Sequence, residues 1–211
     1  MYLIRGQHNL KLFKSRHPNV LLSGTIGNFD GLHLGHQAIL EKIKNNAQKY
    51  NAKTIVFFTE PHAAEYFSKV RDKNQIPPPR ICPWREKFQL LKKSKIDFAC
   101  FLKFNSKLRT MSPDDFISQI LDSINLVSFT VGDDFRFGAG RKGDTDLLKN
   151  WGEKKGILVE NTETITLDGQ RVSSTRIREE LLNNNFNNAE KLLGRSYTFS
   201  GKIVHGQHLG R

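Results

Sequence analysis

Cysteine is scarce in this sequence, and long apolar stretches are absent. The 211 residues include two cysteines, Cys82 and Cys100, which are too few for a disulfide framework. They do not form a C-x-x-C pair, so a zinc site built on cysteine is excluded as well. No run of 18 apolar residues exists, and the N-terminus lacks the apolar core of a signal peptide. These absences predict a protein of the reducing, cytoplasmic compartment with no membrane partner.

Acidic residues are outnumbered by basic ones. The sequence has 33 Lys and Arg against 21 Asp and Glu, a formal net charge of +12. This excess suits an anionic partner, either a nucleic acid or phosphorylated small molecules, but it also suits a simple solubilising surface. The basic residues are spread along the chain, so charge alone leaves these possibilities open. With 37% hydrophobic residues the chain can bury a core, and its length suits one full domain or one domain plus a fragment.

Apolar runs alternate with stretches of helical periodicity along the chain. Strands are predicted at 19–24, 53–58, 98–102, 126–131 and 157–160, and helices at 37–50, 85–94, 112–124, 146–155, 174–183 and 188–193. Asp168-Gly169 predicts a tight turn. The alternation predicts a Rossmann-like α/β fold, a parallel sheet with flanking helices. Because ligands of such sheets lie at the C-terminal ends of strands, we expect the chemistry at 24–36, 58–62, 131–144 and 171–178.

A glycine-rich bend follows the first of these strands and opens the first long helix. Residues 25–36 read T-I-G-N-F-D-G-L-H-L-G-H, and their glycines let the backbone approach a ligand closely. The helix N-terminus offers free N–H groups to a phosphate. His33 and His36 are three residues apart, a spacing that can aim both imidazoles at one oxyanion. The alternatives are a turn with two incidental histidines and a metal site, although no third ligand stands out.

The segment 171–178 reads R-V-S-S-T-R-I-R and combines hydroxyls with arginines. Ser173 or Ser174 can cap a helix, and the hydroxyls of Ser174 and Thr175 can donate to phosphate oxygens. Arg178 lies about one turn further on, where its guanidinium can bind a phosphate with two hydrogen bonds. The alternative is an ordinary capped helix with solvated arginines.

Two further segments carry aromatic and titratable side chains. In 131–144, Phe135 and Phe137 point to the same side if the backbone is extended, so they can form a platform for an aromatic ring. Burial in the core is the other interpretation of this pair. Glu60-Pro61-His62 follows the second strand, where His62 is either a binding residue or an ordinary loop residue.

These motifs resemble those of the H-x-G-H nucleotidyltransferases. The run 25–36 is similar to the T-x-G-x-F-D-G-x-H-x-G-H signature of the bacterial FAD synthetase family, the two-domain riboflavin kinase/FMN adenylyltransferases, and 131–144 and 171–178 also match that family. The resemblance extends from residue 1 to about 197. It implies an FMN adenylyltransferase domain at 1–196 and, at 197–211, the truncated start of a riboflavin kinase domain. Kinase activity is therefore predicted to be absent from this chain.

The resemblance implies the transfer of AMP from ATP to FMN, giving FAD and pyrophosphate. The residues it implies as catalytic are His33, His36 and Arg178. Those implied for ATP are Gly27, Asn28, Phe29, Asp30, Gly35, Arg171, Ser174 and Thr175, and those for FMN are Glu60, Pro61, His62, Asp134, Phe135 and Phe137. Mg²⁺ is expected to arrive with the ATP phosphates and to need few protein ligands. Thr59, Ala63 and Cys82 depart from the family pattern, where Phe, Pro and Thr are usual.

Three other functions are consistent with parts of the sequence. A related nucleotidyltransferase, such as a nicotinate-nucleotide or pantetheine-phosphate adenylyltransferase, would keep the ATP half and change the acceptor. A basic RNA-binding module would use the net charge, although no nucleic-acid partner is predicted here. A flavin carrier would hold FMN or FAD without chemistry. The sequence makes no prediction of oligomeric state.

Overall fold

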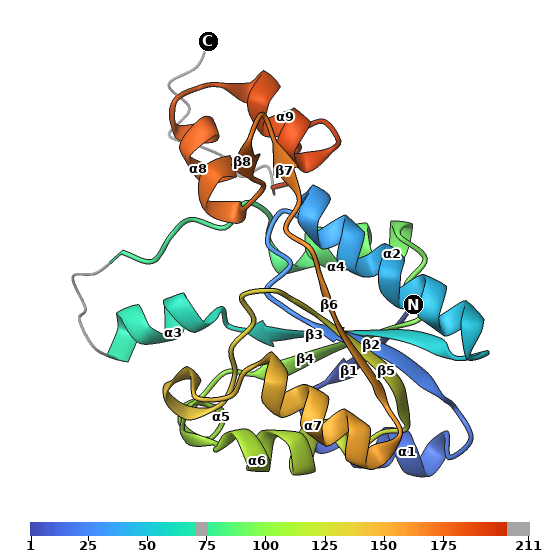
Figure 1. Cartoon of the computed structure of the whole chain (residues 1–211). Coiled ribbons are helices and arrows are strands. Elements are labelled where there is room, and N and C mark those ends of the chain that lie inside the picture. The colour runs from blue at the N-terminus through green and yellow to red at the C-terminus, as the bar shows by residue number, and fades with distance from the viewer. Residues whose placement is uncertain (71–75, 202–211) are drawn as a thin grey trace.

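A computed structural model describes residues 1–70 and 76–201 of the chain. Within these residues, six parallel strands form one sheet in the order β1-β4-β3-β2-β5-β6, with a helical layer on each face (Figure 1). The strands are β1 (Tyr2–Arg5), β2 (Leu22–Ile26), β3 (Lys53–Glu60), β4 (Phe98–Lys103), β5 (Leu126–Gly132) and β6 (Leu158–Thr162). The predicted parallel α/β sheet is confirmed.

Two apolar layers hold the sheet between its helices. The helices α2 (Leu34–Lys49) and α4 (Trp84–Lys93) cover one face, where Leu40, Ile43 and Leu91 are buried. The other face is covered by α1 (His8–Arg16), α6 (Pro113–Phe116), the π-helical turn η1 (Ile117–Leu121) and α7 (Thr145–Lys155). Burial of these apolar faces supplies the main favourable term in folding.

The strand order changes direction beside β2. From β2 the chain adds β3 and β4 on one side, and it then returns to add β5 and β6 on the other. The strands β2 and β5 meet at this point, and Leu126 of β5 leaves no room for a side chain at Gly24 of β2, since a Cβ there would lie 2.9 Å from the Leu126 Cδ2 atom. A crevice forms at such a reversal, outside the carboxyl ends of the strands, and ligands bind there. The segments that follow β2 and β5 are those in which the sequence predicts the chemistry.

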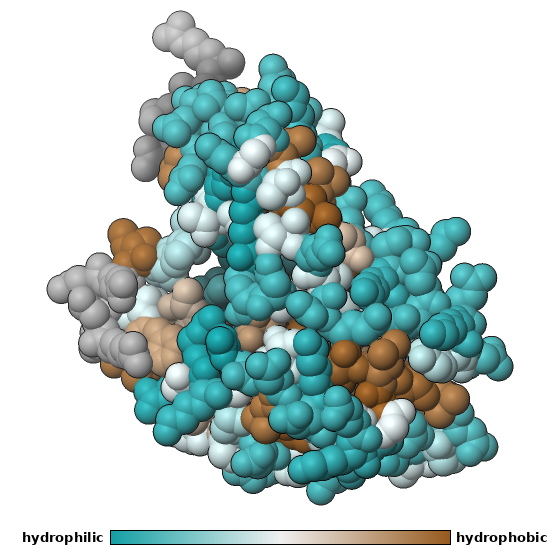
Figure 2. Space-filling view, viewed as in Figure 1, coloured by the Kyte–Doolittle hydropathy of each residue, from teal (hydrophilic) through white to brown (hydrophobic). Residues whose placement is uncertain are grey.

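A small third layer lies beyond the C-terminal ends of the strands. It consists of the hairpin β7 (Thr166–Leu167) and β8 (Gln170–Arg171) with α8 (Ser174–Leu182) and α9 (Phe186–Leu193), which share their own apolar cluster (Figure 1). Asp168 and Gly169 both have positive φ, 55° and 72°, which confirms the predicted tight turn. In the space-filling view the surface is hollowed between this layer and the sheet (Figure 2).

The capping residues explain where several helices begin. Ser112, Asp144 and Ser173 each accept a hydrogen bond from the backbone three residues later, so α6, α7 and α8 start where the sequence predicts, within a residue. Gly194 ends α9 in the left-handed conformation, as expected. The predicted helix at 112–124 is shorter, because regular α-helix ends at Phe116 and η1 follows it.

Other elements differ from the sequence-based prediction. Strand β2 begins three residues later than predicted, at Leu22 rather than at Asn19. Helix α2 begins at Leu34 rather than at Gln37, because the His33 side chain caps it. The elements β1, α1, α3 (Ala63–Val70), α5 (Ser106–Thr110) and the 3-10 turn η2 (Ala139–Arg141) were not predicted. No helix among the described residues is long and apolar enough to cross a membrane.

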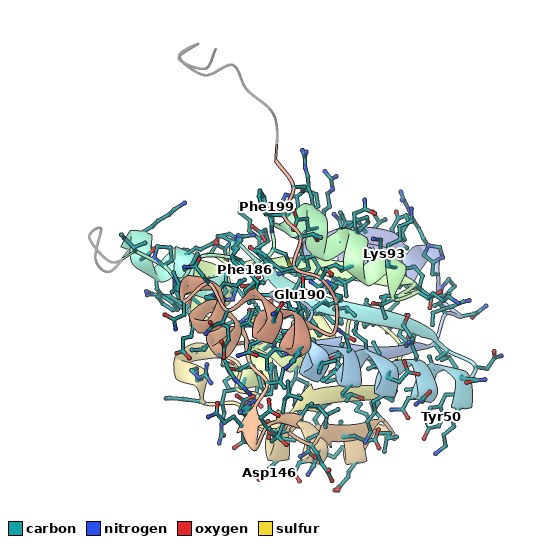
Figure 3. The ribbon with its side chains drawn as sticks, turned by 90° about the horizontal axis from the view of Figure 1, so that it is seen from above. Tyr50, Lys93, Asp146, Phe186, Glu190 and Phe199 are labelled. Atoms are coloured by element: carbon teal, nitrogen blue, oxygen red, sulfur yellow. The ribbon has the colours of Figure 1, made fainter. Side chains whose placement is uncertain are left out.

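The last described residues carry no strand. Seen from above, Phe199 lies beside α4, and α9, with Phe186 and Glu190, lies at the same end of the molecule (Figure 3). Ser200 donates a hydrogen bond from its hydroxyl to Glu86 of α4 at 2.6 Å. The predicted start of a kinase domain at 197–211 falls mostly on residues 202–211, which lie outside the described residues.

Candidate active site

A cavity of about 1140 Å³ lies at the C-terminal ends of the strands, under the hairpin and the start of α8. Most of the residues predicted for the site line it: Gly27, Asn28, Phe29, His33, Gly35, His36, Asp134, Phe135, Phe137, Arg171 and Ser174. The two histidines and the serines that open α8 therefore share one cavity. The other predicted residues do not line it: Asp30, Glu60, Pro61, His62, Thr175 and Arg178.

The two histidines form a stacked pair at the N-terminus of α2. Their ring centroids are 3.6 Å apart with an interplanar angle of 18°. His33 Nδ1 accepts the backbone N–H of His36 at 3.3 Å, so the capping bond that starts the helix also fixes the His33 ring. Gly35 allows this geometry, because a Cβ there would lie 3.3 Å from the His33 ring.

Burial keeps both imidazoles neutral near pH 7. Burial lowers the pKa of His33 to about 4, with Asp30 opposing the shift and Arg171 adding to it. Burial also holds the pKa of His36 well below its usual range, and its electrostatic interactions with His33 and Lys87 add to the effect. Within the described residues, His36 Nδ1 is buried with no hydrogen-bond partner. A neutral ring of this kind can donate a hydrogen bond from its protonated nitrogen to an incoming oxyanion.

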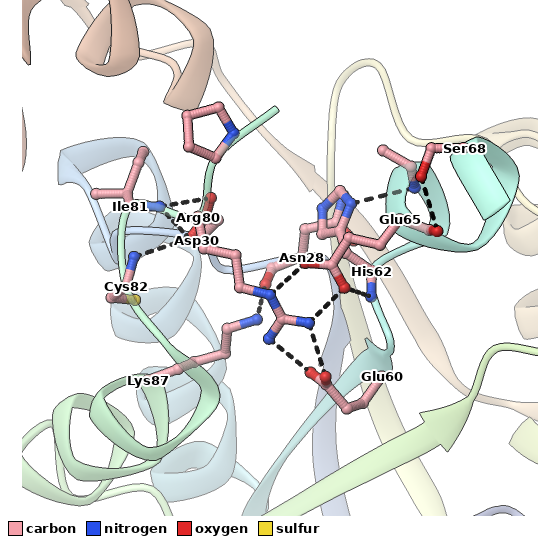
Figure 4. Close-up of polar contacts among 12 residues, drawn as sticks. Asn28, Asp30, Glu60, His62, Glu65, Ser68, Arg80, Ile81, Cys82 and Lys87 are labelled. Atoms are coloured by element: carbon pink, nitrogen blue, oxygen red, sulfur yellow. Dashed lines mark hydrogen bonds and ion pairs between the residues drawn. The ribbon is translucent and has the colours of Figure 1, made fainter. Parts of the chain in front are cut away.

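Asp30 fixes the glycine-rich bend from inside the protein. Its carboxylate accepts the backbone N–H groups of Ile81 and Cys82 at 3.1 and 3.2 Å. Figure 4 shows these contacts of Asp30 with Ile81 and Cys82. Arg178 forms an ion pair with the same carboxylate, with 2.6 Å between its Nη2 and the Asp30 Oδ2. The Asp30 side chain is 4% exposed and that of Arg178 is 17% exposed, so this is a buried pair outside the cavity lining.

The start of α8 is joined to the same bend. Of the two serines that the sequence offers as the N-terminal cap of α8, Ser173 is the cap, because its Oγ accepts the Arg176 N–H at 3.2 Å. The Ser174 hydroxyl donates to the Asp30 carbonyl oxygen at 2.9 Å and also lines the cavity. The hydroxyl and the free N–H groups of α8 therefore lie against the bend that carries His33 and His36.

Arg171 connects β8 to the loop after β5. Its Nη2 lies 3.3 Å from Asp133 and 2.9 Å from Asp134, and all three side chains are substantially exposed. Thr164 also donates to Asp133. Arg171 therefore lines the cavity and is paired there with two carboxylates.

Phe135 and Phe137 are stacked, with centroids 5.7 Å apart and planes 13° from parallel. Phe137 is buried in the core, and its ring centroid lies 5.2 Å from that of Phe116. The core interpretation therefore holds for the Phe137 ring, which also lines the cavity. Sequence reasoning missed three other cavity aromatics, which are Phe116 of α6, Phe67 of α3 and Phe104 after β4. The ring centroids of Phe67 and Phe104 are 5.8 Å apart. The position of Phe104 directly after a predicted strand was an available signal.

The end of β3 is held by an arginine. Arg80 forms an ion pair with Glu60 at 2.7 Å and another with Glu65 (Figure 4). The hydrogen bond from Arg80 holds the pKa of Glu65 below its usual range, and burial lowers the pKa of His62. Two positions that depart from the family pattern, Thr59 and Ala63, line the cavity, and the Thr59 hydroxyl is buried without a partner among the described residues.

The described residues bring together no group of three or more His, Cys, Asp and Glu side chains that could hold a metal ion. The cavity does contain the Asp133 and Asp134 carboxylates, which are oxygen donors of the kind that Mg²⁺ accepts in small number beside phosphates.

The described motifs and geometry agree with a comparison against protein families. The model of the FAD synthetase family matches residues 15–176. The chain belongs to the FAD synthetase family. It is 40% identical over 212 residues to the bifunctional riboflavin kinase/FMN adenylyltransferase of Escherichia coli K12 and 39% identical over 215 residues to that of Haemophilus influenzae. All of this chain is aligned in both cases, and it spans 65% and 66% of the two relatives.

Solved structures support the fold of this FAD synthetase family member. A Streptococcus pneumoniae protein, titled a macrolide-efflux protein, superposes with a TM-score of 0.77 at 23% identity, covering 93% of this chain and 72% of that one. A pantoate-beta-alanine ligase from Francisella tularensis gives a TM-score of 0.53 at 15% identity, covering 91% and 83%. At these identities the likeness concerns the fold alone.

Proposed function

We propose that this chain is an FMN adenylyltransferase that joins FMN and ATP to form FAD and pyrophosphate. The observation that carries the proposal is one cavity lined by the stacked His33 and His36 pair, by the start of α8 and by the aromatic pair Phe135 and Phe137. The first group suits a triphosphate and the second suits a flavin ring. The curated relatives bear the same activity in their names.

In the proposed reaction a phosphate oxygen of FMN attacks the α-phosphorus of ATP. The new bond joins that oxygen to the α-phosphorus, and the bond from the α-phosphorus to the bridging oxygen of the β-phosphate breaks. Pyrophosphate leaves with the electron pair of that bond. Because FMN brings the nucleophile, the protein acts by positioning the reactants and by stabilising the charge on the transferring group. Mg²⁺ enters with the ATP phosphates.

The cavity residues divide between the two substrates in this proposal. Neutral His33 and His36 donate hydrogen bonds to the α- and β-phosphate oxygens, while Ser174 and Arg171 bind the leaving pyrophosphate. Phe135 stacks on the flavin, and Asp134 binds a polar edge of the acceptor. Six residues that the resemblance implies do not line the cavity and have supporting roles: Asp30, Thr175, Arg178, Glu60, Pro61 and His62.

The test is to incubate the purified protein with FMN, ATP and Mg²⁺ and to separate the products by chromatography. We expect FAD and an equal amount of pyrophosphate. Riboflavin is the matched control acceptor, because it carries the same ring but no phosphate to attack, so it should give no FAD. Nicotinate mononucleotide and phosphopantetheine test the related adenylyltransferases. Formation of a dinucleotide from either of these, with none from FMN, would contradict the proposal.

A further inference from the structure

A buried lysine outside the cavity contacts the glycine-rich bend from behind. Lys87 of α4 is 3% exposed, and its Nζ donates a hydrogen bond to the Asn28 carbonyl oxygen at 2.6 Å (Figure 4). The same ammonium lies 5.0 Å from the centre of the Phe58 ring. Among residues 1–70 and 76–201 it forms no ion pair. The carbonyl dipole and the aromatic face stabilise this buried ammonium, together with the negative charges of Asp30 and Glu60 nearby.

Helical periodicity places Lys87 on the buried side of α4, four residues before Leu91. A lysine is almost never fully buried unless a partner compensates for its charge. An apolar side chain would fill this position without that penalty. The presence of lysine is therefore explained by the group that it binds, which is the Asn28 carbonyl oxygen.

This contact fixes the direction of a neighbouring N–H group. The peptide that joins Asn28 to Phe29 is trans, so its C=O and N–H point in opposite directions. Asn28 and Phe29 line the cavity and Lys87 does not. With the Asn28 carbonyl oxygen directed to Lys87, the Phe29 N–H points away from Lys87. Within the described residues no acceptor is bonded to this N–H.

The bend at this point is not favourable by itself. Phe29 has a φ of 48°, a left-handed conformation that a residue with a side chain rarely adopts. The Phe29 ring is fully buried, so the ring is fixed by packing, and the Lys87 contact fixes the peptide that precedes it. If that peptide rotated, a carbonyl oxygen would face the phosphates in place of a donor.

We propose that Lys87 is a positioning residue, which binds the Asn28 carbonyl oxygen and thereby presents the Phe29 N–H to a phosphate oxygen of the nucleotide. Lys87 itself does not touch the substrate. The inference rests on the proposed function, since it assigns the nucleotide to this side of the cavity.

The first test is Lys87→Met, which keeps most of the side-chain length and removes the charge. The change relieves the cost of burying the ammonium and leaves the Asn28 carbonyl oxygen without its donor, and because these two effects oppose each other the unfolding midpoint should change little. We expect kcat/KM for ATP to fall by about 10- to 100-fold, the usual loss when a group that orients a ligand-binding partner is removed. The affinity for FMN, measured by quenching of flavin fluorescence, should not change.

Lys92→Met is the matched control, because Lys92 lies on the same helix and is exposed. It should leave both substrates unaffected. A Lys87→Met enzyme with unchanged kinetics for ATP would overturn the proposal. So would a loss that is equal for ATP and FMN and accompanied by a lower unfolding midpoint, since a purely structural role predicts that pattern.

A second measurement needs no variant. In ¹⁵N-labelled wild-type protein, the Phe29 amide resonance should shift strongly on addition of ATP and of pyrophosphate, and little on addition of riboflavin. An unshifted Phe29 amide in protein that binds ATP would overturn the role of Lys87 even if Lys87→Met does not fold. Failure of the proposed function is a separate result, because the wild-type protein would then form no FAD at all.

Discussion

The two sides of the cavity are held in different ways. On the side of the bend after β2, Asp30 and Arg178 form a pair whose side chains are 4% and 17% exposed. On the side of the loop after β5, Arg171 pairs with Asp133 and Asp134, whose side chains are 37% and 68% exposed. Breaking a buried pair by removing one partner is strongly destabilising, whereas exposed pairs contribute little. The side of the bend, called the rigid side below, is therefore fixed before substrate binds. The side of the loop after β5, called the exposed side, can exchange its ion-pair partners when substrate binds.

This difference separates two arginines of one short segment. Arg178 is tied to Asp30 and to the Pro79 carbonyl oxygen, and it does not line the cavity. Arg171 lines the cavity, and its guanidinium can leave two exposed carboxylates for a phosphate. Both arginines belong to the motif that the family resemblance assigns to phosphate binding, yet the geometry favours that task for Arg171 and a structural tether for Arg178.

The largest effect is expected at the histidine pair of the rigid side. His36→Ala should lower kcat by about 10²- to 10³-fold, because it removes one positioned donor to the charge that develops on the phosphate. The fold should persist, since the cap of α2 is provided by His33. The measurement is steady-state formation of FAD together with thermal unfolding. His17→Ala, an exposed histidine of the chain, is the control. Wild-type turnover in His36→Ala would remove the histidine from the mechanism.

Arg178→Met tests whether the rigid side depends on its buried pair. The change leaves the Asp30 carboxylate buried without its cation, so the free energy of unfolding should fall by about 3 kcal/mol. Denaturant unfolding measures this loss. Arg176→Met on the same helix should cost less, because this guanidinium binds the carbonyl oxygens of Leu167 and Gln170 rather than a buried carboxylate. If Arg178 instead binds pyrophosphate, activity will fall while the unfolding free energy stays unchanged, and the comparison between the two sides fails.

The rigid side should also be sensitive to acid. The pKa of His33 is lowered to about 4, so between that pH and about 6.5 the unfolded chain binds more protons than the folded one. The free energy of unfolding should therefore fall as the pH drops through this window, by about 3 kcal/mol from His33 alone. Below pH 4 the folded state is protonated as well, and no further loss arises from this residue.

The variant His33→Asn isolates that contribution, because asparagine can keep the capping acceptor without a titratable ring. Unfolding midpoints of the two proteins at pH 7 and pH 4.5 provide the measurement. A smaller drop is expected for His33→Asn. Equal drops would show that the buried imidazole does not govern the acid response.

The sequence predicted the parts of this architecture that depend on local patterns. Five of the sheet strands follow from apolar runs, and Ser112, Asp144 and Ser173 start helices because their side chains accept backbone N–H groups nearby. The edge strand β1 and the helix α1 were missed, because Tyr2–Arg5 and His8–Arg16 are short and weakly patterned, and packing against β4 and the core decides them.

The site was predictable in its motifs and less so in its contacts. The glycine-rich bend and the serines of α8 were located from residue types at fixed spacing, and they share the cavity. The pairing of Arg178 with Asp30 joins residues 148 positions apart, and no local pattern contains it. Lys87 and Arg80 were missed for the same reason, since their partners are brought together only by the folded sheet.

The smallest effects are expected on the exposed side, and Arg171→Met tests it. The pair with Asp133 and Asp134 is solvent-exposed, so its loss should change the free energy of unfolding by less than about 1 kcal/mol. The KM for ATP should nevertheless rise by about 10-fold, because a charged hydrogen bond to phosphate is lost. Lys155→Met removes another exposed ion pair, with Asp122, and should leave ATP kinetics unchanged. A large loss of stability in Arg171→Met, with ATP kinetics intact, would contradict the difference between the two sides of the cavity. Arg171 would then have a structural role like that of Arg178, and its ion pairs would not exchange for a phosphate.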